Sequence, residues 1–175
     1  MPLTTLNELQ LLMTGNNTPS TYTASASAEL FSAYLAFTNM RTGDPRSWLA
    51  VATTNSWLQI DLGAATTLSG YGVGEGNYSA SPDSSTPKSW TFRGSSDPTF
   101  SSYTTLDTQT NVAGWVGTLG NWQYFPISPA TFRYYRLNIT ANNGGAVFTG
   151  CYLKLFAPSS GGAVRGQGIL QGGQF

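Results

Sequence analysis

The sequence of 175 residues contains no histidine. Histidine is the usual general base and the commonest transition-metal ligand, so its absence excludes Ser-His-Asp and Cys-His catalysis. Paired carboxylates could in principle hydrolyse a glycoside. The acidic residues outside the predicted strands, however, lie in turn-rich contexts such as Ser96-Asp97-Pro98, where an aspartate caps its own turn. We therefore expect a protein that is not an enzyme and that holds no cofactor.

Cysteine and charge are also scarce. The single cysteine, Cys151, cannot form an intramolecular disulfide, and its apolar neighbours predict a buried thiol in a strand. Only 9% of the residues are charged, and eight basic residues balance eight acidic ones without gathering into a stripe. This balance disfavours binding to nucleic acid or to anionic lipid. The apolar runs fall far short of the roughly 20 residues that a membrane helix needs, so we expect no membrane insertion.

Short runs of alternating apolar and polar residues dominate what is present. In residues 57–62, Leu58, Ile60 and Leu62 face one side of a predicted strand, while Gln59 and Asp61 face the other. Similar alternation follows in residues 89–93, 135–140 and 152–155. Because Gly, Pro, Asn and Ser clusters separate these runs, the pattern predicts an all-β antiparallel sandwich.

Two segments interrupt this pattern. Leucines at helical spacing predict a short amphipathic helix over residues 2–13, and residues 28–37 suit one or two helical turns. We therefore divide the chain into an N-terminal helix and linker (residues 1–20), a sandwich (residues 21–157) and a glycine-rich C-terminal arm (residues 158–175). The arm is expected either to be disordered alone or to dock as an extended segment on a neighbouring subunit.

The loop of residues 41–48 has the composition of a sugar site. Such a site needs an aromatic ring against an apolar sugar face, with guanidinium, carboxylate or amide groups nearby to bond the hydroxyls. Arg41, Asp44, Arg46 and Trp48 supply these groups within eight residues. The alternative is that Trp48 packs into the core while Arg46 pairs with Asp44 at the surface.

The loop that precedes Lys88 is a second candidate. It combines Glu75, Asn77, Tyr78 and Asp83 with serine and proline residues. Loops mounted on a rigid sandwich are where binding residues usually lie. The alternative is an ordinary solvated loop.

Two tryptophans and an asparagine complete the candidate sugar-binding residues. Trp115 and Trp122 bracket a glycine-rich hairpin, and Asn142 begins a turn. Asp61 and Arg136 fall on the polar sides of their predicted strands and could pair, which would be a structural role.

The order of motifs from residue 24 to residue 156 resembles the discoidin family, which is also called the coagulation-factor C-type domain and is close to a galactose-binding class of carbohydrate-binding modules. The matching pieces are Ala24-Ser25-Ala26-Ser27, Ala33-Tyr34-Leu35-Ala36-Phe37, Trp57-Leu58-Gln59-Ile60-Asp61-Leu62-Gly63, residues 87–97, Thr104-Thr105-Leu106-Asp107, residues 134–142 and Leu153-Lys154-Leu155-Phe156. The resemblance implies a jelly-roll β-sandwich of roughly eight strands. It also implies a ligand-binding rim of loops at one end and binding rather than catalysis.

The chain departs from the calcium-binding members of this family. Those members usually have Asp-Gly after the Ala-x-x-Ala-Phe piece and a glutamate just before the last strand. This chain has Thr38-Asn39 and Cys151-Tyr152 at those places. Calcium prefers anionic oxygen ligands, so we expect no tightly bound metal, although Thr38 and backbone carbonyls could hold a weak ion.

The sequences of residues 87–91 and 134–142 also resemble the forms of these motifs found in bacteriophage structural proteins. This resemblance implies a virion subunit, such as a tail fibre, a receptor-binding protein or a capsid decoration, that adheres to a cell-surface glycan. Residues 1–20 and 158–175 would then contact other virion subunits, and the chain would form a homo-oligomer. The alternatives are a purely structural virion protein without sugar binding, and an extracellular bacterial carbohydrate-binding module.

Overall fold

A computed structural model describes residues 7–38, 47–51, 55–76, 82–116, 121–146 and 149–159. Its strands pair antiparallel throughout, which confirms the predicted all-β class. The strands are β1 (Asn7–Glu8), β2 (Thr23–Ala26), β3 (Trp48–Ala50), β4 (Ser56–Glu75), β5 (Pro87–Ser95), β6 (Thr104–Gln109), β7 (Trp122–Asn142) and β8 (Thr149–Ala157), with 3₁₀ turns at η2 (Ala33–Phe37) and η3 (Pro82–Ser85). Within these ranges no helix is long and apolar enough to cross a membrane.

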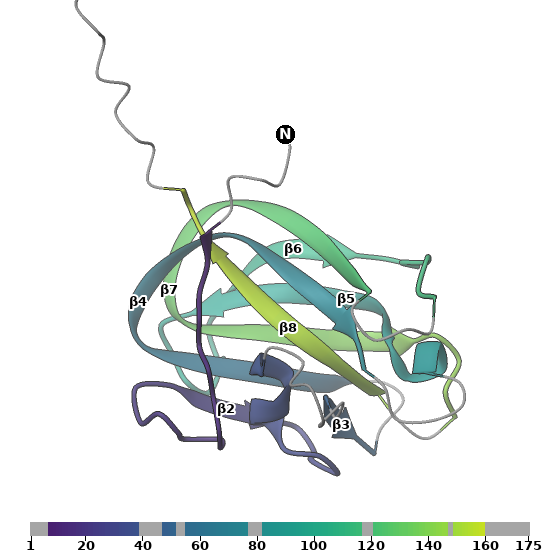
Figure 1. The fold of residues 1–175 in the computed structure, drawn as a ribbon. Helices are drawn as coiled ribbons and strands as arrows, with labels where there is room; N and C mark the ends of the chain where they lie inside the picture. Colours follow the sequence, from purple (N-terminus) through teal and green to yellow (C-terminus); the bar gives the residue numbers. More distant parts are fainter. Residues whose placement is uncertain are drawn as a thin grey trace, which may run out of the picture.

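The fold is organised by one bend shared by β4 and β7. Residues 56–61 of β4 pair with residues 139–134 of β7, and residues 66–74 pair with residues 132–122, with the register shifting between these two blocks. Because both strands bend at the same place, one continuous sheet folds into two layers (Figure 1). The β5 layer holds β2, β5, β6 and the first pairing block. The β8 layer holds β1, β3, β8 and the second block.

Gly63 and Tyr135 fix this bend. Gly63 has φ +75°, and a Cβ atom there would lie 2.5 Å from the backbone oxygen of Thr21, so a side chain is excluded both by conformation and by space. The hydroxyl of Tyr135 lies 2.6 Å from the carbonyl oxygen of Thr66 and 2.9 Å from that of Ala130, and it accepts the backbone N–H of Phe132 at 3.1 Å. Burial raises the pKa of Tyr135 to about 12, so the hydroxyl stays protonated and remains a donor.

The core lies between the two layers and is aromatic at its centre. Tyr71 of the β8 layer stacks on Phe92 of the β5 layer, with ring centroids 4.2 Å apart. Trp90 Nε1 donates to the Tyr71 hydroxyl at 2.8 Å, and that hydroxyl donates to Asp107 Oδ2 at 2.7 Å. Burial, followed by the hydrogen bond to Asp107, raises the pKa of Tyr71 well above its usual value. Cys151 is buried in β8 as predicted, and burial raises the pKa of its thiol.

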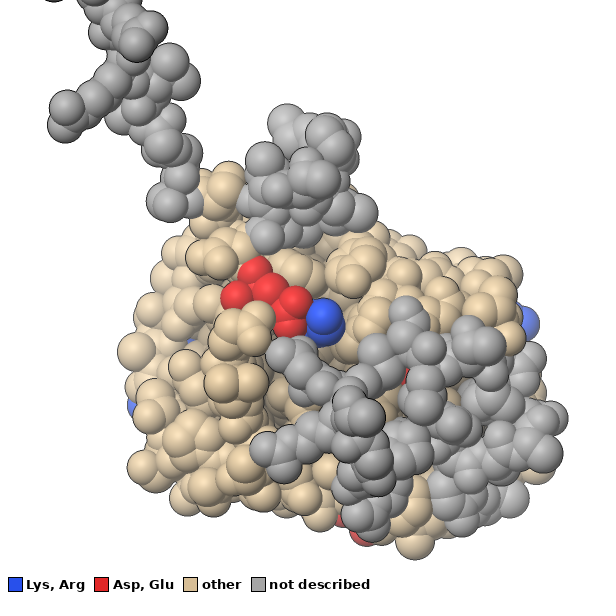
Figure 2. Space-filling view, in the orientation of Figure 1, with Lys and Arg blue, Asp and Glu red and all other residues tan. Residues whose placement is uncertain are grey.

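The predicted N-terminal helix is not what the structure shows over residues 7–13. Instead β1 pairs with β8, and Lys154 Nζ lies 3.0 Å from Glu8 Oε2. Leu11 and Met13 are buried while Leu12, at φ +46°, is exposed, so this segment is not helical. Leucine spacing alone favoured a helix, but the unpaired edge of β8 offers backbone partners that a helix could not use. In Figure 2 acidic and basic atoms touch where Figure 1 places β1 and β8. The helical turn expected within residues 28–37 is confirmed as η2.

The pairing considered for Asp61 and Arg136 is wrong. Asp61 instead forms an ion pair with Arg133, whose Nε lies 2.8 Å from Asp61 Oδ1. The hydrogen bond from Arg133 lowers the pKa of Asp61. Arg136 donates to Gln59 Oε1 from Nε and Nη2, at 3.0 and 2.6 Å. The register explains the difference, because Gln59 lies directly opposite Arg136 and Asp61 lies opposite Tyr134.

We predict that Tyr135→Phe lowers the free energy of unfolding by about 1–3 kcal/mol, because it removes the acceptor of the Phe132 N–H and the single donor that the carbonyls of Thr66 and Ala130 share. Urea denaturation followed by tryptophan fluorescence measures this change. Tyr134→Phe is the matched control: its ring neighbours the same bend, and its stability should change by less than about 0.5 kcal/mol. Equal stabilities of the two variants would show that the hydroxyl of Tyr135 does not hold the bend.

Candidate functional site

The described ends of five connections lie at the end of the sandwich opposite the bend. They join η2 to β3, β3 to β4, β4 to β5, β6 to β7, and β7 to β8. The register places their strand ends together, since Gly74 lies opposite Trp122, Glu75 opposite Cys151 and Pro87 opposite Asn142. We call this end the rim, formed by the described residues 76, 84–86, 112–116, 121 and 143–146. The rim lies where both ends of β4 and β7 reach the same side of the molecule (Figure 1).

Glu75 anchors the rim from below. It is the last residue of β4 and is only 1% exposed. Its Oε2 accepts the backbone N–H of Val116 at 3.2 Å and Asn121 Nδ2 at 2.9 Å, and its own N–H donates to the carbonyl of Asn121 at 3.1 Å. Gln123 Nε2 adds a bond to the carbonyl of Ala113 at 2.8 Å. A buried carboxylate therefore fixes two points of the β6–β7 connection, Val116 and Asn121, to the end of β4.

Trp115 places an aromatic ring on the rim. Its Nε1 donates to the carbonyl of Pro87 at 3.1 Å, and the ring packs partly against the core while remaining half-exposed. The next residue, Val116, is 67% exposed. The two side chains give the rim a fixed apolar surface of the kind that contacts a sugar ring.

Trp48, in contrast, is a core residue. It is buried, and its Nε1 donates to the carbonyl of Ala28 at 3.0 Å. The structure thus favours the alternative left open by the sequence, and Trp48 is removed from the candidate ligand contacts. The other predicted contacts of the first two loops, Arg41, Asp44, Arg46, Asn77 and Tyr78, lie outside the described residues.

The two loops that carry those residues begin and end beside one another. Gly76, at the start of one, packs so closely on Ser47, at the end of the other, that a Cβ at Gly76 would overlap the Ser47 hydroxyl. The rim thus brings together the origins of two segments that lie about thirty residues apart in sequence.

Asn142 closes a rim turn. Its Nδ2 donates to the carbonyl of Gly145 at 2.9 Å, and its Oδ1 accepts the N–H of Gly144 at 3.1 Å. Gly144 has φ +100°, a conformation that favours glycine. The asparagine therefore lies at the rim, with its amide bonded to the β7–β8 turn, and its contact with a sugar stays a prediction.

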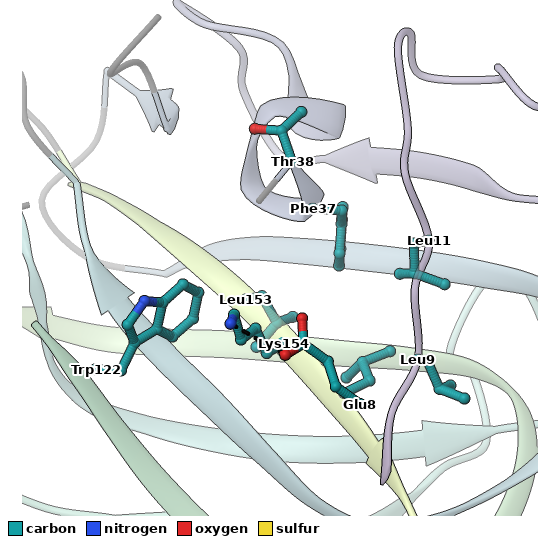
Figure 3. A pocket seen from close by; sticks show the side chains of 9 residues that line it. Glu8, Leu9, Leu11, Phe37, Thr38, Trp122, Leu153 and Lys154 are labelled. Atoms are coloured by element: carbon teal, nitrogen blue, oxygen red, sulfur yellow. Dashed lines mark hydrogen bonds and ion pairs between the residues drawn. The ribbon is translucent and has the colours of Figure 1, made fainter. Parts of the chain in front are cut away.

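Trp122 belongs to a different surface, the outer face of the β8 layer. Its ring lies against Gly74, and Lys154 Nζ lies 4.6 Å from the ring centroid. Figure 3 shows Lys154 between Trp122 and Glu8, with Phe37 and Leu11 nearby. The pocket among these side chains has a volume of about 10 Å³. That is the space of about one water molecule, too little for a saccharide ring.

A comparison with known families identifies this architecture. The sequence profile of the F5/8 type C domain matches residues 19–152. The chain belongs to the F5/8 type C family. No protein of curated function matches it.

Solved structures of other F5/8 type C-like modules share the fold, which confirms the predicted discoidin-like sandwich. One is the Clostridium perfringens module CpGH89CBM32-5 in complex with GalNAc-β-1,3-galactose, at 14% identity and TM-score 0.60, covering 79% of this chain and 96% of that chain. Another is the family 32 module of C. perfringens NanJ in complex with galactose, at 16% identity and TM-score 0.59, covering 78% and 94%. The family 32 module of AlyQ in complex with 4,5-unsaturated mannuronic acid gives 20% identity and TM-score 0.55, covering 76% and 92%.

In this F5/8 type C domain, the place of the family's calcium site has an engaged side chain. The Thr38 hydroxyl donates to the carbonyl of Leu35 at 2.9 Å, and Thr38 is buried. Among the described residues no group of three His, Cys, Asp or Glu side chains could hold a metal ion.

Sequence reasoning missed how the F5/8 type C rim is held together. Glu75 was recognised only as a polar loop residue, and neither Asn121 nor Val116 was considered. Their association depends on the pairing of β4 with the start of β7. Glu75 and Asn121 are 46 residues apart in sequence, so no local motif predicts their contact. A lone glutamate after a run of alternating glycines was the available signal.

We predict that Glu75→Ala loosens the β6–β7 connection, because the N–H of Val116 and the amide of Asn121 lose their acceptor. The free energy of unfolding should fall by about 1–3 kcal/mol. Hydrogen exchange of the Val116 amide should accelerate more than that of core amides. Glu29→Ala removes an exposed carboxylate that bonds only Asn16 and serves as the control. Unchanged exchange at Val116 in Glu75→Ala would contradict the anchoring role.

Proposed function

We propose that this F5/8 type C domain is a non-catalytic module that binds cell-surface carbohydrate through its rim. The observation that carries the proposal is the convergence of five connections on one end of a rigid sandwich. Protein loops positioned in this way carry binding residues disproportionately often. Trp115 and Val116 supply the apolar surface, and the loops that carry Arg41, Arg46, Asn77 and Tyr78 leave from the same end.

The neighbours in structure support the sugar class. The modules that share the fold are described in complex with GalNAc-β-1,3-galactose, galactose and an unsaturated mannuronic acid. A neutral galactoside is therefore the first ligand to test on this chain. A low overall charge fits such a ligand, because neutral sugars are recognised by stacking and by directed hydrogen bonds rather than by long-range attraction.

The absence of catalysis is supported by how the carboxylates are used. Six acidic side chains, those for which the structure gives contacts, each accept a hydrogen bond or ion pair from a basic or neutral group. Glu8 bonds Lys154, Glu29 bonds Asn16, Asp61 bonds Arg133, Glu75 bonds Asn121, Asp97 bonds Thr99, and Asp107 bonds Tyr71. A glycosidase needs two carboxyl groups that face one another across the scissile bond. Carboxylates bound to structural partners serve that role poorly.

Titration calorimetry with galactose, lactose and GalNAc-terminated disaccharides tests the proposal. We expect binding by the intact domain, and at least a tenfold loss for the double variant Arg41→Gln, Arg46→Gln, since about 1.4 kcal/mol of lost guanidinium bonding corresponds to tenfold. Arg133→Gln is the matched control, because Arg133 lies at the opposite end of the sandwich, 45% exposed. A correctly folded domain that binds no glycan on a broad array would exclude the proposal.

The finer proposal is that the module is displayed on a bacteriophage particle as a fibre, receptor-binding or decoration subunit, with an extracellular bacterial module as the alternative. Its support is the resemblance of residues 87–91 and 134–142 to phage structural proteins. Residues 7–13 pack on their own sandwich through β1, Leu11 and Met13. Contacts with other virion subunits, or between copies in a homo-oligomer, are therefore assigned chiefly to residues 158–175.

Deletion of residues 158–175 tests this assignment. The last strand ends at Ala157, so the truncated chain should fold and bind galactosides like the full chain. We expect it to be lost from purified particles, as measured by immunoblotting of sedimented virions. Incorporation at the level of the full chain would contradict attachment through the arm. Absence of the full chain from particles, with secretion into the medium, would favour the extracellular alternative.

A further inference from the structure

The outer face of the β5 layer holds two arginines directly opposite one another. Arg93 of β5 is the cross-strand partner of Arg136 of β7. Their neighbours Phe92 and Leu137 point into the core, so both arginines point outward. Both are half-exposed. In a chain with eight basic residues, two of them thus share one spot on one sheet face.

Each guanidinium of this arginine pair contacts rings and neutral oxygens. Arg93 lies 4.3 Å from the ring centroid of Tyr103, and its Nε donates to Thr91 Oγ1 at 2.8 Å. Arg136 lies 4.3 Å from the Trp57 ring and 4.0 Å from the Phe100 ring. Within the described part of the chain, neither arginine forms an ion pair.

Unused donors therefore face solvent. A guanidinium carries five N–H groups in a planar fork. Arg93 uses one of these groups, and Arg136 uses Nε and one side of Nη2 for Gln59. The Nη groups of Arg93 remain available.

The nearby carboxylates have other partners. Asp61 is paired with Arg133. Asp97 accepts the N–H and hydroxyl of Thr99 at 2.8 Å each, together with the N–H and hydroxyl of Ser101. Asp97 attracts Arg136 without contacting it, whereas burial and then the charge of Arg93 lower the pKa of Arg136. Like charges placed directly opposite on neighbouring strands destabilise a sheet. An anion bound between the two guanidiniums would relieve this repulsion.

We propose that Arg93 and Arg136 bind the carboxylate of an acidic saccharide at a second site, on the sheet face and away from the rim. The planar fork of Arg93 matches a carboxylate. The Tyr103 ring, 46% exposed, lies beside it and can stack on a sugar face.

A cavity that Tyr103 helps to line has room for the rest of the saccharide. Its volume is about 330 Å³, and Ser96, Asp97, Ser102, Tyr103 and Thr104 are among the residues that line it. This volume falls within the range of small-molecule sites, roughly 300–1,000 Å³. The hydroxyl groups of Ser96, Ser102 and Thr104 suit sugar hydroxyls, while the sugar carboxylate lies at the arginine pair. No rim residue contributes to this second site, so the proposal can be tested independently of sugar binding at the rim.

Calorimetry with α-1,4-digalacturonic acid, the corresponding neutral digalactoside and inorganic phosphate tests the second site. We expect the acidic disaccharide to bind more tightly than phosphate, and more weakly as ionic strength rises. Arg93→Gln should weaken that binding by about tenfold or more, since it removes a charge-assisted fork, and should leave the neutral digalactoside unaffected. Arg93→Lys, which keeps the charge without the fork, should fall between the two.

Lys154→Gln is the matched control, because it removes one positive charge from the other layer, where Lys154 pairs with Glu8. It should leave binding of the acidic disaccharide unchanged. The substitution is made at Arg93 because Arg136 is stacked between two rings and its loss could disturb the fold. Two results would overturn the second site: full binding of the acidic disaccharide by Arg93→Gln, or phosphate competing as strongly as the disaccharide. A domain that binds the acidic disaccharide but not the neutral digalactoside would contradict sugar binding at the rim and leave the second site standing.

Discussion

The shared bend of β4 and β7 is the constraint on which the rest of the molecule depends. Two antiparallel strands of about twenty residues each would otherwise extend as a flat ribbon, with their ends on opposite sides. Gly63 supplies the backbone conformation, and one buried hydroxyl, that of Tyr135, bonds three backbone groups where the ladder is interrupted. Since backbone groups in a buried bend must find partners, that hydroxyl compensates for the ladder bonds that the bend removes. Folding back then brings both strand ends to the rim.

The bend also separates two surfaces of different chemistry. At the rim a carboxylate, Glu75, is buried against amide donors, so the loops it fixes face solvent with aromatic and amide groups and little net charge. On the β5 layer the guanidiniums of Arg93 and Arg136 remain outward, held by rings rather than by acids. The rim suits a neutral sugar, whose affinity depends on shape and directed hydrogen bonds. The arginine pair suits a carboxylate, whose affinity depends on charge.

Local alternation was enough to predict one segment in each of β4, β5, β7 and β8 and the side that it buries, as in Leu58, Ile60 and Leu62, because a half-buried strand shows a period of two in its sequence. Features set by register were not predictable. Asp61 was expected to pair with Arg136. In the observed register, however, Asp61 lies opposite Tyr134, two residues from Arg136 along β7. Arg136 therefore bonds Gln59, and Asp61 forms its ion pair with Arg133. The same limit applies to Trp48. Its sequence neighbours are typical of a loop and do not predict that its indole donates to the carbonyl of Ala28. The N-terminal leucines failed for a related reason, since a distant strand edge competed with local helix spacing.

Scarcity of charge makes the remaining ionic contacts informative. The core links its two layers with a neutral chain of donors, from Trp90 through Tyr71, that ends on Asp107. Glu8, Asp61 and Glu75 are likewise each matched to a specific donor. Unpaired or like-charged neighbours are costly where water is partly excluded, and a chain with so few charges could have avoided them at little loss. Arg93 and Arg136 are the exception, because two like charges lie side by side without an ion pair among the described residues. A bound anionic ligand is the simplest explanation for their outward-facing donors.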